Sequence, residues 1–269
     1  HGLVEVNGVR LHYARVGEGP LMLFLHGFPE FWRGWKKPLE YFGARGWCAL
    51  APDQRGYNLS ERPAAVEQYR AKLLIEDIRQ LAQRFTHGRF VLAAHDWGGA
   101  VAWGFAMAHP ELLSHLVIVN SPHPYTFWRE LAGNPAQQQA SAYMLLLRDA
   151  KAERVLSQDG YAKLWQLAFG WGSPQFSEED KAAYFEAWAQ PGALTGGLNW
   201  YRASPLYPPS AADSGAARLS LEAKDFMVEV PTLVIWGDAD KALLPGGLDG
   251  LEACVPDLRV VRVPGASHW

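Results

Sequence analysis

Residues 94–99, which read AHDWGG, form a sharp junction between a predicted strand and a predicted helix. The short apolar run 90–94 is typical of a buried strand, and the small side chains of residues 98–109 are typical of a closely packed helix. This pattern predicts a nucleophile elbow, usually G-x-S-x-G, which holds one side chain above the end of a parallel sheet. In this chain Ala94 replaces the first glycine, and Asp96 stands in the place of the serine.

An aspartate at this position also has a simpler interpretation. Asp is common directly before a helix, where its carboxylate accepts hydrogen bonds from the first free backbone N–H groups. Asp96 would then only cap the helix that follows. We favour a nucleophile because an acid and a histidine occur later in the chain, where an elbow nucleophile has its partners.

The identity of the nucleophile limits the chemistry. A carboxylate that attacks an ester carbonyl forms an anhydride, so an aspartate suits esterase chemistry poorly. Attack on a saturated carbon that carries a leaving group forms an ordinary alkyl ester, and covalent catalysis by aspartate is well established. Water can then hydrolyse this ester. We therefore predict that Asp96 reacts with an epoxide or an alkyl halide.

The composition argues against several other classes of protein. The chain has 269 residues, 49% of them apolar, which suffices for one large α/β domain with an insertion. A net charge of −3 without a run of basic residues argues against a nucleic-acid partner, and no apolar stretch approaches the roughly 18 residues of a membrane span. Two cysteines and nine histidines show no metal-ligand spacing, so we expect neither a metal nor a cofactor.

Apolar runs alternate with helical patterns along much of the chain. Helices are predicted at residues 68–83 and 99–109, between runs that are expected to be strands. This alternation indicates a mostly parallel, doubly wound α/β sheet. The predicted strands cover residues 9–13, 21–25, 48–51, 90–94, 116–120, 232–236 and 258–263.

The alternation breaks between residues 120 and 230, an interval far longer than an ordinary crossover connection. Helical patterns at residues 136–147 and 178–189 indicate that this interval is an inserted helical lid. We assign residues 1–121 and 218–269 to an α/β core and residues 122–217 to the lid. The Pro-, Ser- and Ala-rich residues 204–218 are expected to form its exit linker.

A nucleophilic aspartate needs a base that activates water, and His268 follows the last predicted strand. The acid that orients this histidine should follow the preceding strand, where both Asp238 and Asp240 occur. We choose Asp240, because the loop needs a few residues to turn toward His268, and Asp238 is then a turn residue. Asn120 cannot orient a histidinium by charge and is set aside. A surface-loop role for His268 is the alternative.

The loop after the predicted strand 21–25 begins with HGFPE. A loop at this place supplies one amide of an oxyanion hole, and the residue after the nucleophile supplies the other. We assign these amides to the backbone N–H groups of Phe28 and Trp97. They would stabilise the negative oxygen that forms when water attacks the Asp96 ester. Whether the Phe28–Pro29 peptide bond is cis is left open by the sequence.

Together these segments resemble the soluble-type epoxide hydrolases of the α/β-hydrolase fold. The resemblance extends over the whole chain, including the inserted segment, and no single motif carries it. It implies the α/β-hydrolase fold with an inserted helical lid, and a reaction that opens epoxides to vicinal diols. The matching segments are HGFPEFWRGW (26–35), DQRGYNLSERP (53–63), AHDWGGAVAW (94–103), NSPHP (120–124), GGLNWYRA (196–203), WGDADKALLP (236–245) and SHW (267–269).

In this family two lid tyrosines bind the epoxide oxygen and protonate the alkoxide as the ring opens. The resemblance implies that these are Tyr201, in NWYR, and Tyr143, in SAYM. A phenol above Asp96 can donate a proton to the basic alkoxide in a dry pocket. Packing within the lid is the alternative role of each tyrosine. The side chains expected to contact the substrate are those of Trp97, Phe28, Pro29 and Trp200.

The chain departs from the family pattern at two places. Asn58 stands where the family usually has glycine after Arg-Gly-Tyr, which alters the turn near Tyr57. The sequence also stops directly after His268 and Trp269, so we expect trimmed termini and a missing closing helix. The expected protein is a cytoplasmic enzyme without a cofactor, able to form a homodimer, whose partners are a small apolar epoxide and water.

Three rival interpretations remain open at this point. Haloalkane dehalogenases use the same Asp, His and acid, but Phe28 stands where they commonly have a polar side chain, and a halide needs no phenol. Fluoroacetate dehalogenases follow the nucleophile with an arginine that binds the substrate carboxylate, and this chain has Trp97 there. A non-catalytic ligand-binding protein would have no need for the full set of Asp96, Asp240, His268, Tyr201 and Tyr143.

Overall fold

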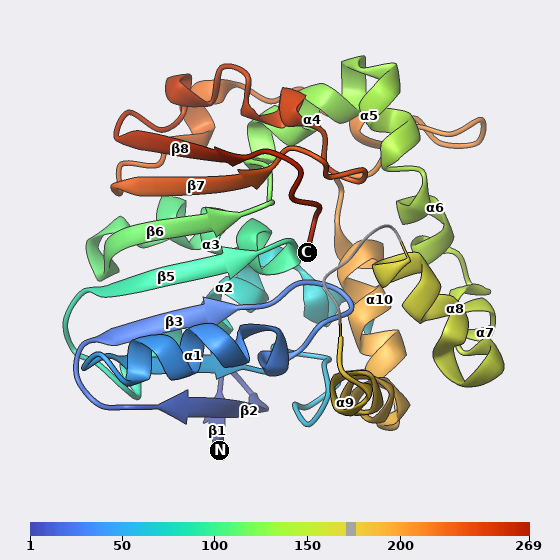
Figure 1. Cartoon of the computed structure of the whole chain (residues 1–269). Coiled ribbons are helices and arrows are strands. Elements are labelled where there is room, and N and C mark those ends of the chain that lie inside the picture. The colour runs from blue at the N-terminus through green and yellow to red at the C-terminus, as the bar shows by residue number, and fades with distance from the viewer. Residues whose placement is uncertain (171–175) are drawn as a thin grey trace.

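A mixed eight-stranded sheet forms the centre of the molecule (Figure 1). The computed structural model describes residues 1–170 and 176–269. The strands are β1 (Gly2–Val6), β2 (Val9–Val16), β3 (Leu21–Leu25), β4 (Cys48–Pro52), β5 (Phe90–His95), β6 (Leu113–Val119), β7 (Thr232–Gly237) and β8 (Leu258–Val263). Their order across the sheet is β1-β2-β4-β3-β5-β6-β7-β8. The pairs β1–β2 and β2–β4 are antiparallel, and the later neighbours are parallel, so the carboxyl ends of β3 to β8 meet at one edge.

Helices cover both faces of the sheet and gather beyond its carboxyl edge (Figure 1). Helix α1 (Lys36–Gly43) lies on one face, and α2 (Ala71–Gln83) and α3 (Trp97–Ala108) lie on the other. The connection from β6 to β7 contains α4 (Pro124–Gly133), α5 (Pro135–Ala140), α6 (Tyr143–Arg148), α7 (Ala152–Leu156), α8 (Gln158–Phe169), α9 (Glu178–Ala189) and α10 (Ala193–Ala203). Within residues 1–170 and 176–269, no helix combines the length and the apolar character needed to cross a bilayer.

The central strand β3 explains why the sheet needs helices on both sides. All five of its residues, LMLFL, are buried. Because successive side chains of a strand point to opposite faces, Met22 and Phe24 belong to the core with Leu39 of α1. The alternate side chains belong to the larger core, which includes Ile78 of α2 and Phe105 of α3. A continuous apolar run in a parallel strand is thus buried between two layers of helices.

The predicted α/β-hydrolase architecture is confirmed, since the observed sheet is mostly parallel and doubly wound. Each predicted strand is present, but β1 was not predicted. Strand β1 forms a hairpin with β2 through Asn7 and Gly8, whose φ angles are 46° and 75°. Asn-Gly is the preferred pair for a two-residue hairpin turn, because both positions need positive φ. This dipeptide was the missed signal.

The prediction of one helix over residues 136–147 is wrong, because α5 and α6 are separate helices. The break falls at Ser141 and Ala142. Buried Ser141 accepts a hydrogen bond from Gln137 Nε2 at 2.8 Å, which satisfies its hydroxyl inside the protein. Tyr143 begins the second helix. The helix predicted at residues 68–83 also begins later, at Ala71.

A strained turn carries Asp96 from β5 into α3. Asp96 has φ 51° and ψ −124°, which non-glycine residues rarely adopt. The turn is possible because Gly98 lets the helix approach β3 closely. A Cβ atom at Gly98 would lie only 2.4 Å from the carbonyl oxygen of Leu25. The nucleophile-elbow geometry expected from the sequence is thus present at Asp96.

A buried ion pair fixes the loop after β4 against α2. Arg55 donates to both carboxylate oxygens of Asp77 at 2.7 Å, and both side chains are almost completely buried. Asn7 Nδ2 also donates to Asp77 at 2.8 Å. Burial raises the pKa of Asp77 in spite of this pairing. The backbone oxygen of Arg55 in turn accepts a hydrogen bond from Trp200 of α10, so this pair supports the helix that carries Tyr201.

We predict that Arg55→Met lowers the free energy of unfolding by about 3–5 kcal/mol, because it leaves a buried carboxylate unpaired. Urea unfolding followed by circular dichroism measures the loss. The matched control is Arg79→Met on α2, the helix that carries Asp77. It removes only a part-exposed pair with Glu76 and should lower the free energy of unfolding by less than about 1 kcal/mol. Equal losses in the two variants would contradict the proposed importance of the buried pair.

Candidate active site

The Asp96 carboxylate lies where the loop after β3 meets the elbow. The Phe28 N–H donates to Asp96 Oδ1 at 2.8 Å. This contact requires Gly27, because a Cβ atom there would lie 2.2 Å from the same oxygen. Behind the turn, Ser121 Oγ donates to the backbone oxygen of Asp96 at 2.7 Å. The Phe28–Pro29 peptide bond, left open by the sequence, is cis.

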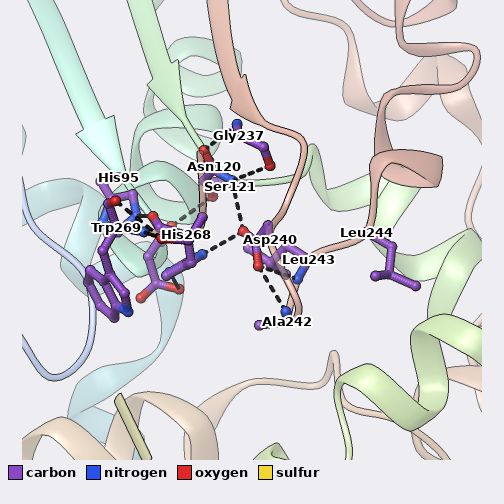
Figure 2. Close-up of polar contacts among 12 residues, drawn as sticks. His95, Asn120, Ser121, Gly237, Asp240, Ala242, Leu243, Leu244, His268 and Trp269 are labelled. Atoms are coloured by element: carbon purple, nitrogen blue, oxygen red, sulfur yellow. Dashed lines mark hydrogen bonds and ion pairs between the residues drawn. The ribbon is translucent and has the colours of Figure 1, made fainter. Parts of the chain in front are cut away.

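His268 lies between two carboxylates that come from distant parts of the chain. Its Nδ1 is 2.7 Å from Asp240 Oδ2 (Figure 2), and its Nε2 is 3.6 Å from Asp96 Oδ2. The side chain of Asp240 is fully buried, and those of Asp96 and His268 are about one-tenth exposed. The 3.6 Å gap between His268 Nε2 and Asp96 Oδ2 is longer than a hydrogen bond, so the two groups are close without being hydrogen-bonded to each other.

Asp240, and not Asp238, faces His268. The other oxygen of Asp240 accepts hydrogen bonds from the backbone N–H groups of Ala242 at 2.8 Å and Leu243 at 3.0 Å (Figure 2). Asp238 instead accepts from Arg262 Nε at 2.8 Å, in an exposed pair. The loop after β7 thus presents one carboxylate to the site and one to the solvent.

Asn120 has a role that charge alone did not reveal. Its Nδ2 donates to Asp240 Oδ2 at 2.8 Å, the same oxygen that contacts His268 (Figure 2). Its Oδ1 accepts from the Gly237 N–H at 2.9 Å. Asn120 therefore holds the acid in place from the end of β6 without contacting the histidine. From the sequence, Asn120 was a rival of Asp240 only, and its supporting role was not predicted.

The charges of His268 and Asp240 depend on each other. Burial lowers the pKa of His268, but the adjacent Asp240 carboxylate outweighs it, and the pKa lies above its ordinary value. Burial likewise tends to raise the pKa of Asp240, but His268 and the hydrogen bonds to its carboxylate hold the pKa below its ordinary range. A histidine in this setting gains a proton readily and releases it to solvent only above its ordinary pKa.

Tyr143 and Tyr201 lie above the carboxylate, on α6 and α10. Their ring centroids are 6.4 Å apart with an interplanar angle of 79°. The Tyr201 ring packs edge-on against both Phe28 and Trp97, with centroids at 5.2 and 5.0 Å. Burial, followed by the nearby Asp96 carboxylate, raises the pKa of Tyr143. Burial also raises the pKa of Tyr201 well above its ordinary value, so both phenols remain proton donors.

Two cavities meet at Asp96, Tyr143 and Tyr201. The linings of both cavities are mostly apolar. The first includes Phe28 and Pro29, and the second includes Trp97, as expected for substrate contacts. Trp200 was also expected to contact the substrate, but the structure places it elsewhere. Among the described residues, Trp200 is not part of either lining; it is buried behind Trp97 and donates to the Arg55 carbonyl at 2.9 Å.

A second histidine supports His268 and was not assigned a role from the sequence. His95 Nε2 is 2.8 Å from the backbone oxygen of His268, and the two rings are 4.6 Å apart. His95 Nδ1 lies 3.5 Å from Glu30, which also accepts from Tyr184 Oη at 2.8 Å. Burial tends to raise the pKa of Glu30, but the contact with His95 holds it below its ordinary value. His95 precedes Asp96 and Glu30 follows Pro29 in the sequence, so their position next to predicted site residues was the signal that could have identified them.

A buried glutamine joins the segment before Tyr143 to the loop that carries Asp240. Gln137 Nε2 donates to the Ala242 carbonyl at 2.8 Å, and its Oε1 accepts from the Leu244 N–H at 2.9 Å. The sequence pattern offered no sign of these contacts, because they join residues more than 100 positions apart. The site thus combines a carboxylate, a paired histidine and two phenols around an apolar cavity. Such a set can perform nucleophilic attack, general-base catalysis and proton donation.

The chain is similar to several known proteins over its whole length. Residues 20–269 match the family model described as alpha/beta hydrolase fold. The chain is 39% identical to the AB hydrolase superfamily protein YfhM of Bacillus subtilis, over 99% of this chain and 90% of that protein. It is 35% identical to epoxide hydrolase 2 of Caenorhabditis elegans, over 100% of this chain and 75% of that protein. A crystal structure of a Bacillus megaterium epoxide hydrolase with an inhibitor is 36% identical, with a TM-score of 0.89, and covers 99% of this chain and 93% of that one.

We predict that Asp240→Asn lowers the pKa of His268 by about 1–3, because burial is then no longer opposed by the adjacent charge. The protonated fraction of His268 at pH 7 should fall accordingly, and NMR titration of labelled histidine measures it. Asp238→Asn is the matched control, since its carboxylate pairs with Arg262 and should leave the pKa of His268 unchanged. An unchanged pKa in Asp240→Asn would contradict the assigned pairing.

Proposed function

This chain belongs to the epoxide hydrolases of the α/β-hydrolase fold, and from this membership we propose that it converts epoxides to vicinal diols through a covalent ester on Asp96. One observation carries the proposal: a carboxylate, not a hydroxyl, stands at the elbow, and it lines the same cavity as two phenols. A carboxylate forms a stable ester only with an alkyl group, and a phenol is needed only when the leaving oxygen is strongly basic.

In the first half of the proposed reaction, Asp96 attacks one epoxide carbon. The C–O bond on that carbon breaks, and its electron pair passes to the epoxide oxygen. Tyr201 and Tyr143 donate hydrogen bonds to this oxygen, and one phenol transfers its proton as the alkoxide forms. Because Asp96 Oδ1 already accepts from the Phe28 N–H, Oδ2 is the oxygen free to attack. The product is a hydroxyalkyl ester of Asp96.

In the second half, water hydrolyses this ester. His268 removes a proton from water, and Asp240 stabilises the resulting imidazolium through the 2.7 Å contact. The water oxygen attacks Asp96 Cγ, and the carbonyl oxygen becomes negative. The N–H groups of Phe28 and Trp97 stabilise this oxyanion. The ester bond then breaks, and the His268 imidazolium gives its proton to the departing alkoxide oxygen, so that the diol leaves. The proton left on the Asp96 carboxyl passes to the tyrosinate and restores the starting state.

The lining of the two cavities supports an apolar epoxide as substrate. An alkyl halide could also alkylate Asp96. The halide ion would leave without a proton, however, so the paired phenols would have no function. A haloacid would need a cationic partner next to the nucleophile, where this chain has Trp97. Residues 122–217 then act as the lid that excludes water during ring opening.

We predict that His268→Gln accumulates the covalent ester, because alkylation continues while hydrolysis stops. With styrene oxide, mass spectrometry should detect a gain equal to the whole epoxide on the peptide that contains Asp96. With 1-bromobutane, a dehalogenase would instead add the butyl group after loss of HBr. His115→Gln, an exposed position on β6, is the control and should turn over styrene oxide normally. A missing epoxide adduct, or a butyl adduct alone, would overturn the proposal.

We predict that Tyr201→Phe slows alkylation roughly 10- to 100-fold, because one of two proton donors is lost and Tyr143 compensates only in part. Single-turnover quench experiments with styrene oxide measure this step. Ester hydrolysis should change little, since the phenol acts on the epoxide oxygen alone. Tyr41→Phe, at an exposed tyrosine, is the control. An unchanged alkylation rate would reduce Tyr201 to a packing role.

A further inference from the structure

Arg148 joins the two helices that carry the site tyrosines. Helix α6 begins with Tyr143 and ends with Arg148, only five positions later. Arg148 is half-buried, and its guanidinium reaches the carboxyl end of α10. Nη1 donates to the backbone oxygen of Tyr201 and, at 3.0 Å, to that of Ser204. The side chain that ends one tyrosine helix therefore binds the backbone of the other tyrosine itself.

The carboxyl end of a helix is a favourable place for this cation. The last carbonyl groups of a helix lack partners within the helix and carry partial negative charge. Helix α10 ends at Ala203, so the carbonyls of Tyr201 and Ser204 belong to this end. Arg148 satisfies both of them from outside the helix. The contact is thus stronger than an exposed ion pair and is directed at one turn of α10.

An aromatic ring holds the guanidinium from its other side. The Cζ atom of Arg148 lies 3.7 Å from the ring centroid of Tyr207, in stacking position. Tyr207 is itself fixed, because its hydroxyl donates to Asp213 at 2.7 Å and accepts from Arg218 at 2.6 Å. Arg148 therefore connects α6, α10 and the segment through which the chain leaves the inserted region.

Two arginines join the ends of the two helices. Arg202 of α10 donates to the backbone oxygen of Asp149, directly after α6, at 3.1 Å, and Arg148 makes the reciprocal contact from α6. Helix α10 is attached to the core through Trp200 Nε1 and the Arg55 carbonyl. The segment before α6 is attached to a different part of the core, the loop after β7, through Gln137. Each tyrosine helix is thus attached to a different part of the sheet edge. Arg148 is the side chain that bonds α6 directly to the Tyr201 backbone.

We propose that Arg148 is a positioning residue, which keeps Tyr143 and Tyr201 close enough to bind the same epoxide oxygen. This role rests on the proposed function of the site. Arg148 does not touch the substrate, and it acts through the two phenols. Because the phenols serve ring opening only, the loss of Arg148 should slow alkylation of Asp96. Hydrolysis of the ester depends on His268 and the amides of Phe28 and Trp97, so it should be unaffected.

The experiment compares Arg148→Met, Arg148→Lys and Arg129→Met in single-turnover reactions with styrene oxide. Arg129 is the matched control: it lies on α4 and donates to the backbone oxygens of Gly246 at 2.9 Å and Asp249 at 2.7 Å, so its loss removes a similar arginine–carbonyl contact outside the two tyrosine helices. We expect Arg148→Met to slow alkylation about 10- to 100-fold, the range in which misplacement by about 1 Å acts. The rate of ester hydrolysis should stay within about twofold. Arg148→Lys should recover most of the alkylation rate, and Arg129→Met should alter neither step.

A double-mutant cycle tests whether Arg148 acts through Tyr143. In a Tyr143→Phe background, Arg148→Met should cost much less than in the wild-type protein, because the phenol that it positions is already absent. If Arg148→Met does not fold, the same cycle is measured with Arg148→Lys, which should then show a smaller loss that also disappears with Tyr143→Phe.

Three results would overturn this role: equal slowing of both steps, no slowing in folded protein, or additive losses in the cycle. An equal effect of Arg129→Met would show that general weakening of the inserted region is the cause. A wild-type protein that forms neither ester nor diol would instead overturn the proposed function. The two failures are therefore distinguishable.

Discussion

The close approach of three chain segments around the Asp96 carboxylate is the constraint on which the rest of the structure depends. Asp96 sits at φ 51°, a conformation that costs on the order of 1–3 kcal/mol and persists only when its surroundings hold it. The Phe28 N–H, the bare backbone of Gly27 and the Ser121 hydroxyl supply that support. Small residues in the elbow are therefore a requirement of the site as much as of the fold.

The same region concentrates charge that must be paired because it is buried. Asp240 is bound by His268, Asn120 and two backbone amides, and Glu30 is bound by His95 and Tyr184. Asp96 faces the mostly apolar cavity that Tyr143 and Tyr201 also line, and its Oδ1 is bound by the Phe28 N–H. A carboxylate removed from water but not fully paired is a better nucleophile than one on the surface. The paired carboxylates around it therefore leave Asp96 as the group that we propose to react.

Much of this site could be predicted from local patterns, and the misses share a cause. The elbow at Asp96, the loop at Phe28 and the late histidine each follow a strand, so periodicity and chain order locate them. The support of Asp240 by Asn120 and of His268 by His95 was missed, because these contacts join residues from different strands. The break before Tyr143 was also missed, because residues 136–147 have a continuous helical pattern and nothing local in it marks an end at Ala140.

The sequence by itself determined the order of strands and helices, the carboxylate at the elbow and the family to which the chain belongs. These follow from apolar periodicity and from residue types at short spacing, which act locally along the chain. Only the tertiary structure decided that Asp240 faces His268 while Asp238 faces Arg262, that Trp200 supports the site from behind, and that Arg148 joins the two tyrosine helices. The direction of a side chain depends on the groups packed around it, and most of those groups are distant in sequence.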